Sequence, residues 1–216
     1  MRIAEQTISQ IWLAFILLSL AACSAPMPSS TPSQMFKEEA GMSAPVPAKT
    51  EYSDKDFGRA LAALKDGNLK QAEKLFLVVS QVHPELVSPH SNLGIIYYQG
   101  GRWEEALNAF QQAVKLDQQD YVAYNYLGIV QRNMGQFLDA KLAYEHALDI
   151  KPDYSYAHLN LAILYDLYLN ELGQAMNHYS QYMTLTGGED KRINGWMADM
   201  RQRTQNTSSG TDKERK

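Results

Sequence analysis

Three kinds of position recur along this chain with a spacing of 34 residues. They are a small residue, an aromatic ring and a glycine: Ala72, Ala106 and Ala140; Phe76, Phe110 and Tyr144; Gly67, Gly101 and Gly135. A period of this length is typical of arrays of helix pairs, in which each unit buries its apolar face only against its neighbours. From Ser53 to Thr186 the apolar positions keep a helical period, and no alternating, strand-like run interrupts them. The pattern therefore predicts an all-α array of four units, at 53–86, 87–120, 121–154 and 155–188.

Within a unit, large side chains face small ones where two helices would cross. Gly94 and Gly128 let paired helices approach closely, and Phe110 and Tyr144 fill the space between them. Glycine at the end of each first helix suits a left-handed cap. This arrangement resembles the tetratricopeptide repeat. The resemblance implies a right-handed superhelical solenoid of about four helix hairpins that binds a protein or a peptide.

The fourth unit departs from the period. Ala175 follows Ala140 by 35 residues, so one extra residue lies within Asp166–Leu172. Beyond Gly188, residues 189–203 place four apolar side chains on one helical face: Ile193, Trp196, Met197 and Met200. Repeat arrays need a capping element over their last apolar face, so we expect a capping helix here. The alternative is an amphipathic helix that binds a partner, and residues 204–216 are expected to be a disordered polar tail.

The N-terminus carries a targeting pattern. Residues 1–22 hold an apolar run too short to span a bilayer and long enough for a secretory signal. The run ends in Leu-Ala-Ala-Cys, which resembles the lipobox of bacterial lipoproteins. The resemblance implies cleavage before Cys23, its acylation, and, with Ser24 next, delivery to the outer membrane on its periplasmic face. A plain signal peptide that contains a cysteine is the alternative.

Composition and motifs narrow the classes of function and partner that remain. Residues 23–52 are rich in Pro and Ser and lack hydrophobic periodicity, which predicts a disordered tether. The net charge of −4 argues against nucleic acid as the main partner. Among the five histidines no ligand spacing occurs, and no nucleophile elbow or phosphate loop is present. We therefore expect no metal, no cofactor and no enzyme activity, and we expect His90 and His158 to be packing rings.

The working surface implied by the resemblance is a groove lined by the first helix of each unit. An apolar and aromatic strip with asparagine amides suits a peptide or helix, because rings supply contact area and amides pair with backbone groups. The alternative is that several of these residues pack against neighbouring helices. Carried over residue by residue, the groove positions are Phe57, Leu61, Leu64, Ser91, Asn92, Ile95, Tyr98, Asn125, Ile129, Arg132, Tyr156, Leu159, Ile163 and Asp166.

Some repeat domains of this family hold a C-terminal carboxylate with Lys, Asn and Arg at five set positions. Here four of those positions are occupied by Phe57, Leu61, Val122 and Tyr126, and only Asn92 matches. The sequence therefore argues against a clamp for chaperone tails.

Together these features predict an outer-membrane-anchored periplasmic adaptor that binds a protein partner in the assembly of a cell-envelope complex. One alternative is a pilotin-like assembly factor for a type IV pilus or a secretin. Another is a subunit of an energised envelope machine of the motility or TonB-like kind. A cell-wall hydrolase is a further alternative, and it predicts a cluster of histidines and carboxylates in a pocket. Association between copies of the chain is also open.

Overall fold

The computed structural model describes residues 55–188 and 190–211, all of which belong to one compact unit. The predicted signal peptide, Cys23, the tether and residues 212–216 lie outside this part of the chain. Within it every element is helical and no strand occurs. The helices are α3 (Lys55–Lys65), α4 (Leu69–Val82), α5 (Val87–Gln99), α6 (Trp103–Leu116), α7 (Tyr121–Asn133), α8 (Phe137–Ile150), α9 (Ser155–Leu164), the π-helical turn η2 (Tyr165–Leu169), α10 (Leu172–Thr186) and α11 (Lys191–Thr211).

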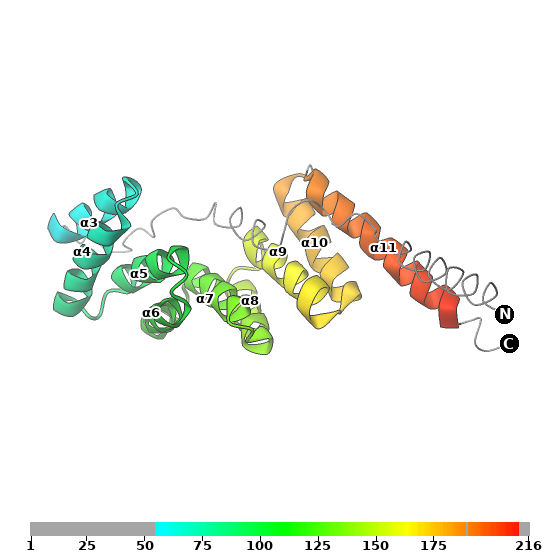
Figure 1. Ribbon diagram of the computed structural model, residues 1–216, viewed down its shortest axis with the longest axis horizontal. Helices are drawn as coiled ribbons and strands as arrows, with labels where there is room; N and C mark the ends of the chain where they lie inside the picture. Colours follow the sequence, from blue (N-terminus) through cyan, green and yellow to red (C-terminus); the bar gives the residue numbers. More distant parts are fainter. Residues whose placement is uncertain (1–54, 189, 212–216) are drawn as a thin grey trace, which may run out of the picture. The chain divides into compact units, whose positions relative to one another are not determined.

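The helices form consecutive antiparallel hairpins. Close packing joins α3 to α4, α5 to α6, α7 to α8 and α9 to α10, and each second helix also contacts the first helix of the next pair (Figure 1). Each unit predicted from the period contains one such pair. The all-α solenoid of helix hairpins expected from the sequence is confirmed.

The glycines at the crossing points allow the helices to pack as closely as they do. A Cβ atom added at Gly94 would lie 2.7 Å from the ring of Phe110, and one at Gly128 would lie 2.6 Å from the ring of Tyr144. Both rings are fully buried. Because a carbon cannot approach a ring so closely, only glycine fits at either position without displacing the aromatic side chain.

The turn inside each of the first three hairpins uses the same glycine cap. Gly67, Gly101 and Gly135 have φ values of +74°, +69° and +77°. In the second hairpin the backbone N–H of Arg102 donates to the carbonyl of Tyr97 at 2.9 Å, and the other two turns repeat this bond. A left-handed residue is strained for any side chain with a Cβ atom, so the recurring glycine is a requirement of the turn.

The extra residue of the fourth unit is absorbed in a π-helical turn. Tyr165–Leu169 widens the end of α9, and the backbone N–H of Glu171 donates to the carbonyl of Tyr165 at 2.9 Å. Asn170 then adopts a left-handed conformation with φ 54°, in place of the glycine of the other turns. A single inserted residue commonly produces such a bulge, because it keeps the helix continuous while shifting its register.

Helix α11 covers the end of the array. Ile193, Met197 and Met200 are buried, and the ring of Trp196 lies 5.8 Å from that of Tyr179 on α10. These contacts cover apolar side chains of α10, and the capping role remains a prediction. The helix extends past Arg203 to Thr211, whereas the sequence predicts a disordered tail from residue 204. The prediction is wrong for residues 204–211. No proline interrupts this stretch, so no missing N–H breaks the hydrogen bonds of the helix there.

Candidate functional site

The first helices of the last three hairpins share one continuous face. Helix α5 contacts α7 and α7 contacts α9, in addition to the contacts that each makes within its own hairpin. Side chains from three successive repeats therefore lie next to one another on this face. This is the surface from which the sequence predicts partner binding.

The predicted groove residues fall into three classes of exposure. Tyr156 is exposed, with 38% of its surface accessible. Leu61, Leu159 and Asp166 are half-buried. The others are buried: Phe57, Leu64, Ser91, Asn92, Ile95, Tyr98, Asn125, Ile129, Arg132 and Ile163.

The residues from the first unit serve the hairpin itself. Phe57 and Leu64 belong to the hydrophobic core between α3 and α4, and Leu61 packs against it. The ring of Phe57 meets that of Phe76 edge-on, with 5.8 Å between centroids. The described array has no repeat before α3, so this first helix buries its apolar side chains against its own partner helix, α4. For these three residues the structure therefore shows the packing role that the sequence left open as the alternative.

A polar cluster crosses from α7 to α9 on the shared face. The side-chain amide of Asn160 donates to the side-chain oxygen of Asn125 at 2.9 Å, and Nη1 of Arg132 lies 3.5 Å from the side-chain oxygen of Asn160. All three side chains are at least 98% buried. The two amides and the guanidinium thus satisfy one another across the two helices. On α5, Asn92 instead donates to the carbonyl of Ser88 within its own helix.

Aromatic rings continue the face toward α5. Tyr98 lies 5.7 Å from the ring of Trp103 and 6.2 Å from that of Tyr126, which stacks on Phe110 at 5.2 Å. Burial, with smaller contributions from Tyr98 and Tyr156, raises the pKa of Tyr126 well above its usual range. The phenol therefore stays neutral and can donate a hydrogen bond at any physiological pH.

The groove positions predicted from the sequence include neither Asn160 nor Tyr126, although Tyr126 stands at one of the clamp positions. Asn92, Tyr126 and Asn160 are separated by 34 residues each and occupy the same place in three successive units. Alignment on the period was therefore the signal that could have found them. The predicted groove contains Leu159, which directly precedes Asn160 in α9.

A pair of histidines joins α9 to α10. The Nδ1 atoms of His158 and His178 lie 3.0 Å apart, and Nε2 of His158 lies 3.0 Å from the carbonyl oxygen of Pro152. Because a carbonyl can only accept, His158 donates from Nε2, and the neutral ring accepts from Nδ1–H of His178. The ring of Tyr165 stacks on His178 at 5.7 Å. Burial, together with the neighbouring His158, lowers the pKa of His178 to about 4.

His90 occupies the corresponding place in the second unit. Burial lowers the pKa of His90, and its hydrogen bond to the backbone of Pro84 opposes this shift. His90 and Pro84 each precede His158 and Pro152 by two periods. A histidine that bonds the end of the preceding second helix thus recurs in the second and fourth units, which agrees with the expected packing role of both rings.

Asp166, the last predicted groove residue, is engaged by the capping helix. Its carboxylate forms an ion pair with Arg203 of α11, and its side chain is only 7% exposed. The pairing ties the π-helical turn to α11. Asp166 is thus part of the cap at this end of the face.

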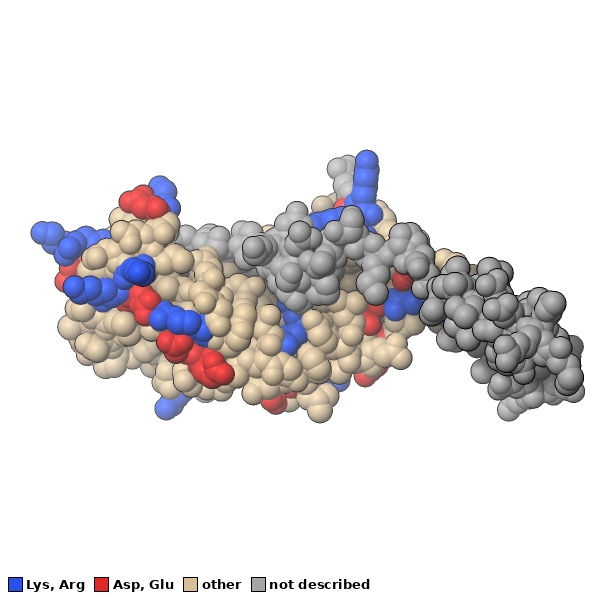
Figure 2. Space-filling model, viewed as in Figure 1, with Lys and Arg blue, Asp and Glu red and all other residues tan. Residues whose placement is uncertain are grey.

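Three further features bear on the class of site. No group of three or more His, Cys, Asp or Glu side chains in the described part of the chain could hold a metal ion. Among the same residues, no helix is both long and apolar enough to cross a membrane. On the face drawn in Figure 2, basic and acidic side chains are interspersed over the first hairpins. Nucleic acid binding relies instead on a concentrated basic surface.

Comparison with known proteins decides what these hairpins are. Two family models, described as "TPR repeat" and "Tetratricopeptide repeat", match residues 94–135 and 121–154. The chain carries tetratricopeptide repeats. Together the two matches cover most of the second hairpin and the whole of the third, in which the glycine and aromatic pairs are most regular.

Solved structures share this fold at low sequence identity. MamA from Desulfovibrio magneticus RS-1 superposes with a TM-score of 0.64 at 16% identity, over 74% of this chain and 92% of that one. The TPR2B domain of yeast Sti1, solved as a pHsp70 complex, superposes with a TM-score of 0.51 at 17% identity, over 54% of this chain and 97% of that one. At such identities the likeness concerns the fold alone.

Curated relatives match this chain over short regions. The peroxisomal targeting signal receptor of Candida glabrata is 32% identical over 71 residues, which is 33% of this chain and 12% of the receptor. The protein O-mannosyl-transferase TMTC2 of Mus musculus is 29% identical over 107 residues, which is 43% of this chain and 13% of that protein. The matched region thus spans a small fraction of each relative. A receptor and an enzyme are thus both among the matched proteins, and the repeats here are of the type found in protein-binding scaffolds.

Proposed function

We propose that this protein is a lipid-anchored adaptor of the outer membrane, facing the periplasm, whose repeats bind a protein or peptide during assembly of a cell-envelope complex. The lipobox at Cys23 supports the anchor, because a lone cysteine directly after an apolar leader is the acceptor in bacterial lipoproteins. The chain acts by binding alone, without catalysis.

One observation carries the binding part of the proposal. Asn125, Asn160 and Arg132 gather on the face shared by α7 and α9, next to the Tyr98–Tyr126 ring pair. The cluster fixes the register of α7 and α9, and Tyr156, exposed on α9, gives an extended segment an accessible contact on this face. The aromatic neighbours supply apolar contact area.

The occupant is a segment of the partner chain, and a free C-terminal carboxylate is not the determinant. The positions that would hold such a carboxylate carry Phe57, Leu61, Val122 and Tyr126. Phe57 is committed to the core of the first hairpin, and Tyr126 is held between Phe110 and Tyr98. None of the four side chains has the positive charge that a carboxylate requires.

Two experiments test the two halves of the proposal separately. Replacement of Cys23 by Ser should move the protein from the membrane fraction to the soluble fraction; continued membrane association would refute lipidation as the anchor. Replacement of the exposed Tyr156 by Glu should reduce recovery of the partner in co-purification from membranes by at least about tenfold. The matched control is Leu138→Glu on α8, since Leu138 is 71% exposed and lies on a second helix. Equal recovery with both variants would exclude the shared face as the site.

A further inference from the structure

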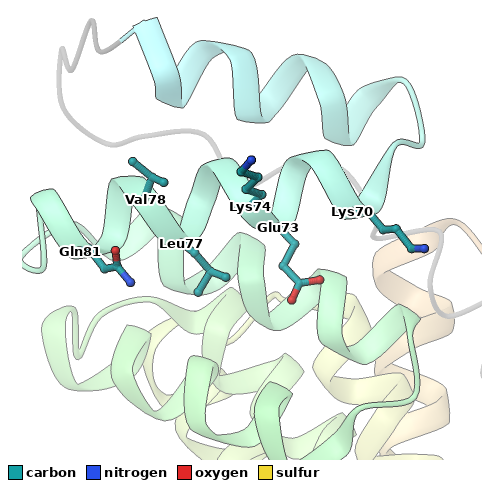
Figure 3. A pocket seen from close by; sticks show the side chains of 6 residues that line it. All are labelled: Lys70, Glu73, Lys74, Leu77, Val78 and Gln81. Carbon is teal, nitrogen blue, oxygen red and sulfur yellow. The ribbon is translucent and has the colours of Figure 1, made fainter.

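The outward face of α4 carries apolar side chains that its own hairpin does not cover. Leu77, Val78 and Val82 keep 38%, 41% and 63% of their surface exposed. Leu77 and Val78 lie midway along a hollow of about 390 Å³, lined in the described part of the chain by Lys70, Glu73, Lys74, Leu77, Val78 and Gln81. We call these six residues the α4 stripe. In Figure 3, Lys74 and Val78 form one edge of this stripe, and Glu73 and Leu77 form the other.

The other repeats show that the fold does not need Leu77 and Val78 to be apolar, whereas Val82 is followed by Leu116 and Ile150 at its own place in the period. One period after Leu77 and Val78 stand Gln111 and Gln112, which are exposed on α6. Two periods after Leu77 the chain has Glu145 on α8. Since the same outer positions are polar in the second and third hairpins, the apolar side chains of α4 serve contact with another molecule.

The spacing of the stripe suits a helix that lies along it. The six lining residues follow the i, i+3, i+4, i+7, i+8, i+11 pattern of a single helix face. Helices with such faces pair by interdigitating their side chains, and two antiparallel copies of one helix form an isologous contact. A two-fold axis between Leu77 and Val78 would set each Leu77 against Val78 of the other copy.

Charge supports a second copy of this chain as the occupant. Glu73 is held by Arg102 at 2.7 Å, whereas neither Lys70 nor Lys74 forms an ion pair with any side chain that the structure describes. Glu85 lies just beyond the other end of α4, with 68% of its side chain exposed. In an antiparallel pair the basic end of one α4 lies against the end of the other that carries Gln81 and Glu85. The Lys70 end of one α4 thus lies near the exposed Glu85 of the other copy.

We infer that α4 is a homodimer contact, in which two copies pack antiparallel about Leu77 and Val78. One helix pair buries less than the roughly 1,600 Å² of a standard stable interface, so the dimer is weak and depends on concentration. This contact lies on the second helix of its hairpin, and it is independent of the partner-binding face proposed for the first helices.

Sedimentation equilibrium of the purified Cys23→Ser chain tests the inference, because this variant has neither a lipid nor a thiol through which copies could associate. Over a roughly hundredfold range of concentration, the average mass should rise from one chain toward two. Val78→Glu should raise the dimer dissociation constant more than about tenfold, because it places two carboxylates in the apolar centre. Lys70→Glu should weaken the dimer, and Lys70→Glu with Glu85→Lys should restore it.

Leu138→Glu on α8 is the control, since it changes an exposed leucine away from α4. It should leave the dissociation constant within about twofold of the unchanged chain. A chain that stays monomeric at every concentration would overturn the inference. So would a dimer that survives Val78→Glu or is abolished by Leu138→Glu. Failure of the charge exchange to restore the dimer would exclude the antiparallel arrangement.

Discussion

The side-chain amide of Asn160 on α9 donates a 2.9 Å hydrogen bond to the side-chain oxygen of Asn125 on α7. The two residues belong to successive repeats and are both fully buried. Most contacts between the repeats are apolar and tolerate small shifts, whereas a hydrogen bond between two short side chains requires one register. This bond therefore fixes how α7 and α9, the first helices of the third and fourth hairpins, lie against each other at the candidate binding face.

Replacement of Asn160 by Leu should destabilise the protein by about 1–3 kcal/mol, because a buried amide oxygen at Asn125 loses a donor. The double variant Asn125→Leu with Asn160→Leu should cost less than the sum of the two single changes. Urea unfolding followed by circular dichroism measures all three variants as a double-mutant cycle. Purely additive losses would show that the two amides do not depend on each other.

Gly128→Ala should destabilise the protein by about 1–3 kcal/mol, since its Cβ would lie 2.6 Å from the enclosed ring of Tyr144. Gly173→Ala is the matched control, because a Cβ atom added there meets nothing within 4 Å. Gly173 lies in α10, where alanine is the better helix former, so this change should be neutral or slightly stabilising. Thermal unfolding compares the two. A loss at Gly128 no larger than that at Gly173 would contradict the close packing described for this crossing.

Much of this fold follows from residues whose role is local. A glycine that must take a positive φ, as at Gly101, and a glycine that must sit under a ring, as at Gly94, can be recognised from spacing alone. The insertion in the fourth unit was detectable as a shift of one residue, but its π-helical form depends on how Tyr165 and Asp166 pack against α10 and α11.

The candidate site was less predictable, because exposure depends on tertiary packing. Phe57 and Tyr98 have the same aromatic character in the sequence, yet Phe57 packs inside the first hairpin whereas Tyr98 joins a ring pair between repeats. The hydrogen bond of Asn160 to Asn125 runs diagonally between non-equivalent positions of the repeat. A residue-by-residue transfer along the period cannot produce such a pair.

Acid should destabilise the fourth repeat through His178. The pKa of His178 falls from 6.5 to about 4 in the folded protein, so the unfolded chain binds a proton more readily. Stability contributed by the neutral ring is complete above pH 6.5 and is lost progressively as the pH falls toward 4. Allowing for the solvent that reaches this half-buried ring, the loss should be about 1–2 kcal/mol.

The melting temperature, measured between pH 7 and pH 4.5, tests this prediction against His178→Phe. Phenylalanine keeps a ring to stack on Tyr165 and cannot be protonated. The variant should therefore show a shallower decline with acid than the unchanged protein. Parallel declines would place the acid sensitivity elsewhere.

Met200→Ala should loosen the cap. Met200 is completely buried in the contact of α11 with the array, and loss of a buried methionine side chain costs about 2–5 kcal/mol. In a repeat array the terminal element can open separately, so amide hydrogen exchange should accelerate first in α11 and α10. Arg201→Ala, one residue later and exposed, should leave exchange unchanged. Uniform acceleration over all repeats would instead indicate that the array unfolds as a single unit.

The central claim is that the face of the first helices binds the partner, and photocross-linking in living cells tests it most directly. A photoreactive phenylalanine analogue placed at Tyr156 keeps a ring on α9 and avoids disturbing the buried residues. At Leu138 on α8 the same group lies on the outer side of a second helix and is the control. The account predicts a discrete cross-linked protein from position 156 and none from position 138. Cross-linking to a partner from position 138 alone would contradict it.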